Sequence, residues 1–282
     1  MRSDRGGAQR DGHGDLPAAA CEGVVKIYWT PTGEVHALKG VDAEFPDASV
    51  TAVVGPSGSG KSSLLRILAG LDSPTAGSVR VGNRELKGLR AGGLRRMRRH
   101  SVGYVFQRPS DNLLPYLTVA GHLRMASRIR APFSRPRTME LLEPLGLAPH
   151  RDKLPHQLSG GEQQRLAFAQ AVIGKPSLLV ADEPTAELDS ETDAHLLDVM
   201  AGLAARGVGV VMATHDPEAI RVANKAVYLR HGAIEAETQR GQLVSVIDAS
   251  GRIQLPPAAI KLFPGRRAVI TLGERGLEIF PP

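Results

Sequence analysis

Three short apolar runs along the chain predict the buried strands of a sheet. Residues 49–54 read SVTAVV, residues 177–182 read SLLVAD and residues 207–214 read GVGVVMAT. Each run has the length of a buried strand and lacks the alternation of a half-exposed one. The first run is followed by glycines and then by Leu64 and Leu68 at a helical spacing. Strand, loop and helix in this order predict an α/β fold.

The composition fits one large globular domain with a small appendage. The chain has 282 residues, of which 42% are hydrophobic, enough for a sizeable core. No apolar run approaches the roughly 18 to 20 residues that a membrane-spanning helix needs. Residues 1–20 are polar, so we expect a disordered leader and a chain that is not secreted. Cys21 is the only cysteine, which excludes an intrachain disulfide and a multi-cysteine metal site and fits a cytosolic setting.

A run of arginines stands out in this basic chain, whose formal net charge is +6. It comprises Arg90, Arg95, Arg96, Arg98 and Arg99. Such runs bind nucleic acid or anionic headgroups in some proteins, but more often they form the solvated face of a helix. The sequence favours the solvated face and leaves the two binding functions open.

The glycine-rich loop after the first apolar run carries the clearest chemistry. Its sequence GPSGSGKS matches G-x-x-x-x-G-K-[ST] between a predicted strand and a predicted helix, a context that argues against an incidental lysine in a turn. Glycines let successive backbone N–H groups wrap a phosphate, and the helix that begins near Gly60 adds its positive dipole end. We expect Lys61 to reach the β- and γ-phosphates of a nucleotide and Ser62 to ligate Mg²⁺. The predicted nucleotide contacts of this loop are Gly55, Ser57, Gly58, Gly60, Lys61, Ser62 and Ser63.

Polar side chains end the other two apolar runs. Asp182 and Glu183 end the second run, and His215 follows the third. Parallel α/β sheets bind ligands at the carboxyl ends of their strands. Asp182 is therefore a candidate to hold Mg²⁺ through water, Glu183 a candidate general base, and His215 a candidate γ-phosphate sensor. Solvated acids at a strand end and a structural histidine are the alternatives.

Residues 158–165, LSGGEQQR, make neither a good strand nor a good turn. Gly160 and Gly161 would each weaken a helix by roughly 1 kcal/mol relative to alanine. The stretch therefore indicates a helix start whose backbone N–H groups approach another molecule or segment closely.

Taken together, these motifs resemble the ATP-binding subunit of an ABC transporter over residues 22–238. In that family the Ser-Gly-Gly turn contacts the γ-phosphate of ATP held by the other subunit, so the site is composite and the dimer is head-to-tail. The resemblance implies ATP and Mg²⁺ as cofactors and ATP hydrolysis as the reaction. It also implies that the residues acting in trans here are Ser159, Gly160, Gly161 and Glu162.

Other positions match the same family pattern. The resemblance implies that Gln107, in GYVFQRP, approaches Mg²⁺ and the attacking water and links the site to a helical subdomain. Tyr28 resembles the aromatic residue that stacks on adenine, with Trp29 beside it as a competitor. Asp189, in AELDS, matches the D-loop, although Glu187 stands where such loops often carry a small or amide residue.

The resemblance also implies an architecture. We expect a RecA-like P-loop ATPase core over residues 21–240, with an antiparallel β-subdomain interleaved over residues 22–106 and a helical subdomain at about residues 108–160. A membrane subunit would dock on residues 108–120. The residues that are equally candidates for core and for this interface are Phe106, Leu113, Leu114 and Tyr116.

Several segments narrow the resemblance to one group of transporters. TPTGEVHALKGV, GYVFQR, NLLPYLTV and DEPTAELDS are similar to the macrolide-efflux, lipoprotein-release and division-associated group. In that group the membrane partner is a separate polypeptide, and the work is mechanical. This implies an ATPase that powers export or force transmission on the inner face of the cell membrane, with an integral membrane permease of the FtsX-like type as partner.

Residues 241–282 predict a small β-rich extension that needs a partner to fold. We expect a strand, a turn at residues 250–251, a strand, a short helix after Pro256 and a hairpin around residues 273–276. VIDASGRIQLP resembles the swapped hairpin of transition-state regulators and antitoxins, which implies a dimerisation module over residues 243–280. A plain stabilising extension is one alternative. DNA binding is the less favoured one, and its candidate residues are Arg252, Lys261, Arg266 and Arg267.

Two other functions remain as alternatives to a transporter subunit. One is a soluble ABC-type ATPase, and the other is a regulator whose basic tail binds DNA while the ATPase senses nucleotide. Translation-type members carry two cassettes in one chain and repair-type members insert a long coiled coil, and this sequence shows neither feature.

Overall fold

In the computed structural model the three apolar runs lie side by side as parallel strands. The structure describes residues 16–130, 140–186, 190–239, 242–245, 253, 261–263, 267–273 and 276–281. The runs form β3 (Val50–Val54), β7 (Leu178–Asp182) and β8 (Gly209–Thr214). Every residue of β7 and β8 is buried, as continuous apolar strands require in a sheet covered on both faces. β8 pairs in parallel with both β3 and β7, so the predicted parallel arrangement is confirmed.

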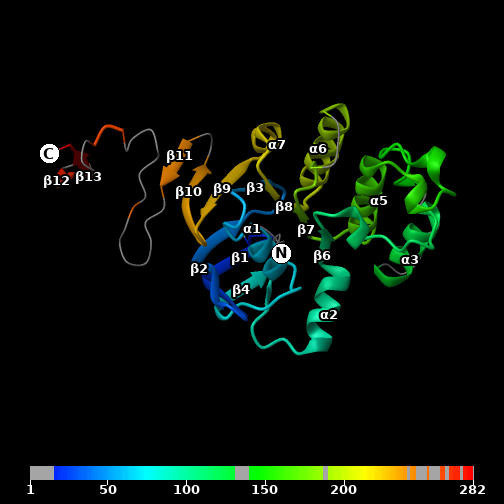
Figure 1. Cartoon of the computed structure of the whole chain (residues 1–282), viewed down its shortest axis with the longest axis horizontal. Helices are drawn as coiled ribbons and strands as arrows, with labels where there is room; N and C mark the ends of the chain where they lie inside the picture. Colours follow the sequence, from blue (N-terminus) through cyan, green and yellow to red (C-terminus); the bar gives the residue numbers. More distant parts are fainter. Residues whose placement is uncertain are drawn as a thin grey trace, which may run out of the picture.

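These strands belong to a seven-stranded sheet in the order β11-β10-β9-β3-β8-β7-β6. The strands from β9 (Lys225–Arg230) to β6 (Val102–Val105) are parallel. β10 (Ala233–Gln239) and β11 (Gln242–Ser245) continue the sheet antiparallel, at the side that Figure 1 shows in orange. The carboxyl ends of the parallel strands therefore meet along one edge.

A second, four-stranded antiparallel sheet has the order β2-β1-β4-β5, which confirms the expected antiparallel subdomain. Its strands are β1 (Ala19–Thr30), β2 (Gly33–Phe45), β4 (Ala76–Val81) and β5 (Arg84–Glu85). β1 begins inside the segment 1–20 that the sequence assigns to a leader, and residues 1–15 lie outside the described residues. α1 (Lys61–Leu68) packs between the two sheets, where its four leucine and isoleucine side chains join one core with Phe45.

Among the other helices, α2 (Ala91–His100) joins the core of α1 through Met97, and the rest cover the opposite face or form a lobe beside β6. The rest are α3 (Val119–Arg130), α5 (Gly160–Val172), α6 (Ser190–Ala204) and α7 (Pro217–Val222), with short 3-10 helices η1 (Pro109–Asp111), η2 (Ala148–His150) and η3 (Pro155–Gln157). A second core joins α3, α5 and α6 to β7 and β8. Figure 1 shows α3 and α5 together at the end of the molecule remote from β11. No helix among the described residues is long and apolar enough to cross a membrane.

The chain ends in a hairpin of two strands. β12 (Val269–Gly273) pairs antiparallel with β13 (Gly276–Phe280), so the predicted hairpin is confirmed. The turn at residues 250–251 and the helix after Pro256 fall outside the described residues. Figure 1 places the hairpin beyond β11, away from the two sheets.

Candidate functional site

A cavity of about 740 Å³ opens at the carboxyl edge of the parallel sheet. The loop between β3 and α1 forms its floor, and the segments that follow β7 and β8 form one wall. The cavity brings together residues that are distant in the sequence. Those with a predicted role are Tyr28, Ser57, Gly58, Gly60, Lys61, Ser62, Ser63, Gln107, Glu183 and His215.

The loop that leads into α1 needs glycine at two positions for steric reasons. A Cβ at Gly55 would lie 2.1 Å from the Leu229 carbonyl oxygen, and one at Gly60 would lie 2.4 Å from the Ala37 carbonyl oxygen. Gly60 also has a φ of 106° and precedes α1 without a side-chain cap. The first N–H groups of α1 therefore have no side-chain acceptor from the capping position. Gly55 does not line the cavity, and its role in the structure is close packing against β9.

Lys61 lies folded back over its own loop. Its ammonium donates hydrogen bonds to the carbonyl oxygens of Gly55 at 2.9 Å and Pro56 at 3.3 Å. It also lies 3.7 Å from Glu183 Oε1, with only 10% of the side chain exposed. The Lys61 cation is therefore held against the loop between β3 and α1, at the cavity.

Glu183 is held between two basic groups at the end of β7. Its Oε2 lies 2.8 Å from His215 Nδ1, and its Oε1 faces Lys61. Its backbone has a φ of 47°, unfavourable for a residue with a side chain, and its N–H donates to the Ala213 carbonyl at 3.0 Å. This turn directs an 11% exposed carboxylate into the cavity, while His215 remains 76% exposed. The structure thus joins the ends of the second and third apolar runs, as the sequence predicts.

Asp182, the last residue of β7, lies behind the cavity and does not line it. It is buried, and its Oδ1 has no hydrogen-bond partner among the described residues. Burial raises the pKa of Asp182, against the lowering effects of a hydrogen bond from the Ser62 hydroxyl and of the Lys61 charge. A buried carboxylate oxygen without a donor is a position suited to a cation.

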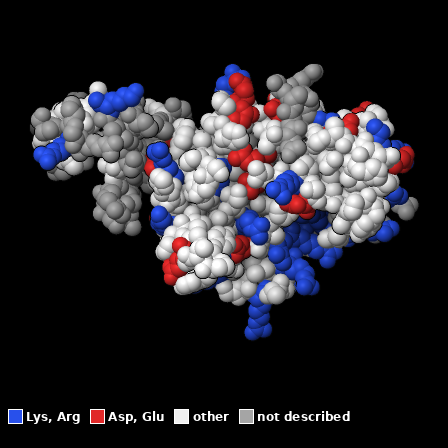
Figure 2. Space-filling model, in the orientation of Figure 1, with Lys and Arg blue, Asp and Glu red and all other residues white. Residues whose placement is uncertain are grey.

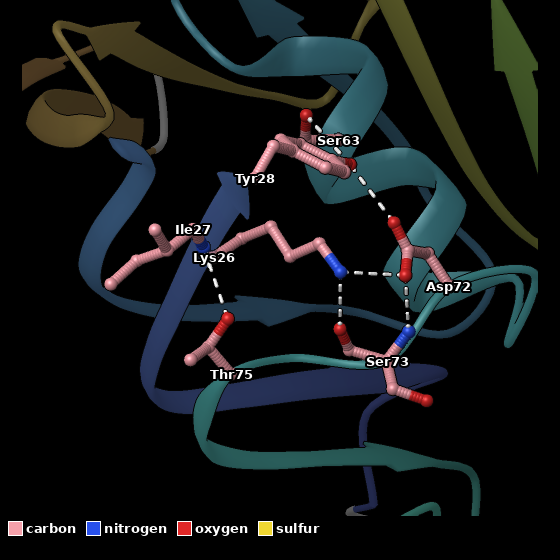
Figure 3. Close-up of polar contacts among 7 residues, drawn as sticks. All are labelled: Lys26, Ile27, Tyr28, Ser63, Asp72, Ser73 and Thr75. Atoms are coloured by element: carbon pink, nitrogen blue, oxygen red, sulfur yellow. Dashed lines mark hydrogen bonds and ion pairs between the residues drawn. The ribbon is translucent and has the colours of Figure 1, made fainter. Parts of the chain in front are cut away.

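Tyr28 is fixed by a polar cluster that sequence reasoning missed (Figure 3). Its hydroxyl donates to Asp72 Oδ2 at 2.9 Å, and Lys26 Nζ bonds Asp72 Oδ1 at 2.7 Å. The same ammonium lies 4.7 Å from the centre of the Tyr28 ring. Burial raises the pKa of Asp72, but the hydrogen bonds from Lys26, Tyr28 and the Ser73 backbone together bring it below its usual value. Trp29, the alternative aromatic, is 78% exposed and does not line the cavity.

Gln107 follows β6 and also lines the cavity. The segment after it is ordered by Asn112, whose side chain accepts from the Phe106 N–H at 2.9 Å and donates to the Tyr104 carbonyl at 3.3 Å. The four residues that the sequence left as candidates for either core or interface differ in their exposure. Leu113 is buried, Phe106 and Leu114 are half-buried, and Tyr116 is 71% exposed.

The LSGGEQQR segment starts α5, as predicted, but lies outside the cavity. Ser159 is the N-cap residue, and its hydroxyl accepts from the Glu162 N–H at 3.2 Å while Glu162 Oε2 accepts from the Ser159 N–H at 2.8 Å. Glu162 Oε1 also lies 2.9 Å from His150 Nε2, an ion-pair contact that no local sequence signal indicates. Gly160 and Gly161 form the first turn behind this cap. Asp189 falls outside the described residues.

Comparisons with known proteins agree with this arrangement. The family model described as ABC transporter matches residues 38–186. The macrolide export ATP-binding/permease protein MacB of Chlorobium luteolum is 37% identical over 235 residues, which cover 82% of this chain and 35% of that protein. The chain thus spans about a third of the length of the MacB relatives that it matches.

Shorter relatives and solved structures match over nearly their whole length. The lipoprotein-releasing system ATP-binding protein LolD 2 of Caulobacter vibrioides is 37% identical, covering 78% of this chain and 98% of LolD 2. The dimeric post-hydrolysis structure of the ATP-binding cassette MJ0796, bound to ADP and Pi, is 34% identical, with a TM-score of 0.73. It covers 78% of this chain and 98% of its own. The chain therefore belongs to the ABC transporter family and has the fold of that family's ATP-binding cassette.

Proposed function

We propose that the chain binds and hydrolyses ATP as a head-to-tail homodimer and powers export or force transmission through a separate integral membrane permease. One observation carries this proposal. The cavity unites Lys61, Glu183 and His215, whereas the capped start of α5 with Ser159 lies outside it. A second copy would complete the site by bringing its own α5 to the open cavity.

Within the cavity the side chains have separable tasks. Lys61 would exchange the carbonyls of its own loop for the β- and γ-phosphate oxygens of ATP, assisted by the uncapped N–H groups of α1. Glu183 would take up a proton from the attacking water, and its contacts with Lys61 and His215 hold its carboxylate at the cavity. His215, largely exposed, would meet the γ-phosphate from the side of β8.

The residues behind the loop fit a magnesium ion. The Ser62 hydroxyl and Asp182 Oδ1, which has no hydrogen-bond partner among the described residues, are hard oxygen donors, which Mg²⁺ prefers. Asp182 would act through water. Gln107, which lines the cavity, would supply a third oxygen. When bound, the ion would neutralise charge that develops on the phosphate oxygens. Ligation would also favour the charged form of Asp182, whose pKa burial raises.

Tyr28 is placed to stack on the adenine ring. It lines the cavity, and its hydroxyl is fixed by Asp72, so the ring is oriented before the base arrives. Lys26 lies over the ring, which leaves the opposite ring face for the base.

The trans contacts and the permease complete the proposal. Ser159, Gly160, Gly161 and Glu162 would approach the γ-phosphate of the second copy, with Asp189 of the D-loop between the two sites. The permease, of the FtsX-like type, would dock on residues 108–120, where exposed Tyr116 lies close to Gln107 in sequence. The names of LolD 2 and MacB, which refer to lipoprotein release and macrolide export, support an export function.

The tail would hold the two copies together between turnovers. Exposed apolar side chains are concentrated in it, including Val269, Ile270 and Phe280 of the hairpin. A barrel formed from residues 243–280 of two chains would cover them and make reassociation intramolecular. Sedimentation without ATP tests this, because the full chain should be dimeric and a chain truncated after Gly241 monomeric. An equally dimeric truncated chain would contradict the role of the tail.

Mixing two inactive variants tests the composite site. Ser159→Arg blocks the start of α5 and Lys61→Ala blocks the cavity, so a heterodimer retains one intact site made from the unmodified half of each chain. We expect part of the ATPase activity to return on mixing, measured as phosphate release from heterodimers isolated with two different tags. Verified heterodimers as inactive as either variant alone would contradict action in trans.

A further inference from the structure

The basic character of this chain is concentrated in one stretch. Residues 86–130 hold ten lysines and arginines and one acidic residue, Asp111, which gives a formal charge of +9. The rest of the chain holds 25 basic and 28 acidic residues, which gives −3. The net charge of +6 therefore arises entirely from a segment that spans β6, α2 and α3.

The folded structure keeps these charges together and exposed. α2 and α3 are adjacent, and Arg99 Nε of α2 donates a hydrogen bond to the Ile129 carbonyl of α3. Figure 2 shows Lys and Arg gathered over α2 and toward α3. We define the α2–α3 basic surface by the exposed side chains of Lys87, Arg90, Arg95, Arg96, Arg99, Arg124 and Arg128. None of them forms an ion pair with any residue that the structure describes.

An ordinary solvated helix face does not account for this arrangement. Solvated helices usually place acids three or four residues from their basic side chains, and neither α2 nor α3 contains an acidic residue. Instead, Arg95 and Arg96 each have another arginine three residues later, at Arg98 and Arg99, where like charges repel. An anionic partner would remove this repulsion.

Two further features favour a membrane as that partner. Ile129 is 50% exposed beside Arg128, and an apolar side chain among arginines suits the boundary between headgroups and acyl chains. α2 and α3 contain no phenylalanine, tyrosine or tryptophan, whereas proteins that bind single-stranded nucleic acid stack bases on aromatic side chains.

We propose that the α2–α3 basic surface binds the anionic phospholipid headgroups of a membrane directly. This binding requires neither ATP nor the permease, so it goes beyond the proposed function and can be tested separately from it. It also orients the cassette, because residues 108–118, which include the exposed Tyr116, lie between α2 and α3 in the chain.

Vesicle co-sedimentation of the full chain tests the proposal. The protein should bind vesicles of equal parts phosphatidylcholine and phosphatidylglycerol, remain free with phosphatidylcholine alone, and dissociate as salt is raised. Each basic side chain near an anionic surface strengthens binding by roughly fivefold, so Arg95→Gln, Arg96→Gln and Arg128→Gln together should weaken binding about a hundredfold. The single variant Arg96→Gln should weaken it roughly fivefold.

A charge-matched control distinguishes the effect of this surface on vesicle binding from the effect of net charge. Arg206→Gln, Arg221→Gln and Arg230→Gln remove three exposed arginines outside α2 and α3 and should leave vesicle binding nearly unchanged. Both triple variants should keep the ATP affinity of the parent chain, because none of these arginines lines the cavity. The proposal is overturned if phosphatidylglycerol vesicles do not bind, or if the control triple loses as much binding. It is equally overturned if duplex DNA displaces the vesicles through the same arginines.

Discussion

Two helices of this cassette begin at a glycine-containing turn, but only one of them has a side-chain N-cap. α1 begins after Gly60 without a side-chain cap and opens into the cavity. α5 begins at Ser159 with a reciprocal cap from Glu162 and lies outside the cavity. An uncapped end leaves N–H groups for an anion, and a capped end is stable by itself. Under the proposed function, α1 would bind phosphate within one chain, whereas α5 would present a preformed surface to another chain.

The largest expected effect concerns the chemistry beside α1. Glu183→Gln should lower ATP turnover by roughly 10²- to 10⁴-fold, because an amide keeps the shape but cannot take up the proton. ATP binding should persist, so the variant should accumulate as an ATP-bound dimer in size-exclusion chromatography. Glu218→Gln, an exposed control on α7, should turn over normally. Near-normal phosphate release by Glu183→Gln would show that the base lies elsewhere.

The next effect tests whether α1 and its loop bind phosphate without a second chain. Lys61→Ala should weaken ATP binding by about 1.5 to 3 kcal/mol, the usual size of a hydrogen bond to a charged group. Titration calorimetry on the Glu183→Gln background gives the affinity without hydrolysis. Lys87→Ala, exposed on the loop before α2, is the matched control. An affinity within twofold of the parent would contradict the assignment of Lys61.

A substitution at the capped start of α5 should lower stability and leave the ATP affinity of a single chain unchanged. Ser159→Ala removes the N-cap of α5 and should lower the free energy of unfolding by about 1 kcal/mol without changing the affinity of a single chain for ATP. Thr118→Ala, which removes the hydroxyl that accepts from the Gly121 N–H at the start of α3, should cost about as much. Thermal unfolding measures both losses. Only Ser159→Ala should also reduce ATPase activity, and equal activities would remove the distinction between the two ends.

The smallest effect is the pH dependence of the α5 cap. Burial raises the pKa of Glu162, but the Ser159 hydrogen bonds and the charges of His150 and Lys153 bring it below its ordinary 4.5. A lowered pKa means that the charged form stabilises the fold above pH 4.5 and that this stabilisation is lost as the pH falls through the folded-state value.

Glu162→Gln keeps an acceptor oxygen but does not titrate. The melting-temperature difference between parent and variant should therefore be largest near neutral pH and should shrink as the pH falls below 4.5. Thermal unfolding over a pH series gives this difference, with Glu218→Gln as the control. A difference that grows in acid would mean that the cap does not depend on the Glu162 charge.

Local motifs of the site could be predicted from the sequence, and contacts between distant segments could not. Lys61, Glu183 and His215 each follow an apolar run, and parallel strands bring such ends to one edge. The bond from Lys26 to Asp72 crosses 46 residues and carries no periodic signal. Asp182 ends its run in the same way, yet its buried carboxylate lies behind the cavity, where it accepts a hydrogen bond from the Ser62 hydroxyl.

The polar cluster around Tyr28 has a consequence for the choice between nucleobases. Its hydroxyl is engaged by Asp72 and lies 3.4 Å from Ser63 Oγ, so it has no free donor for the edge of a purine. Tyr28 can therefore stack on a base, but it cannot donate a hydrogen bond to the amino or keto group that distinguishes adenine from guanine. The contribution of Tyr28 to binding would be about the same for guanosine and inosine triphosphates as for ATP. A preference for ATP must therefore come from other residues of the cavity or from the supply of nucleotides.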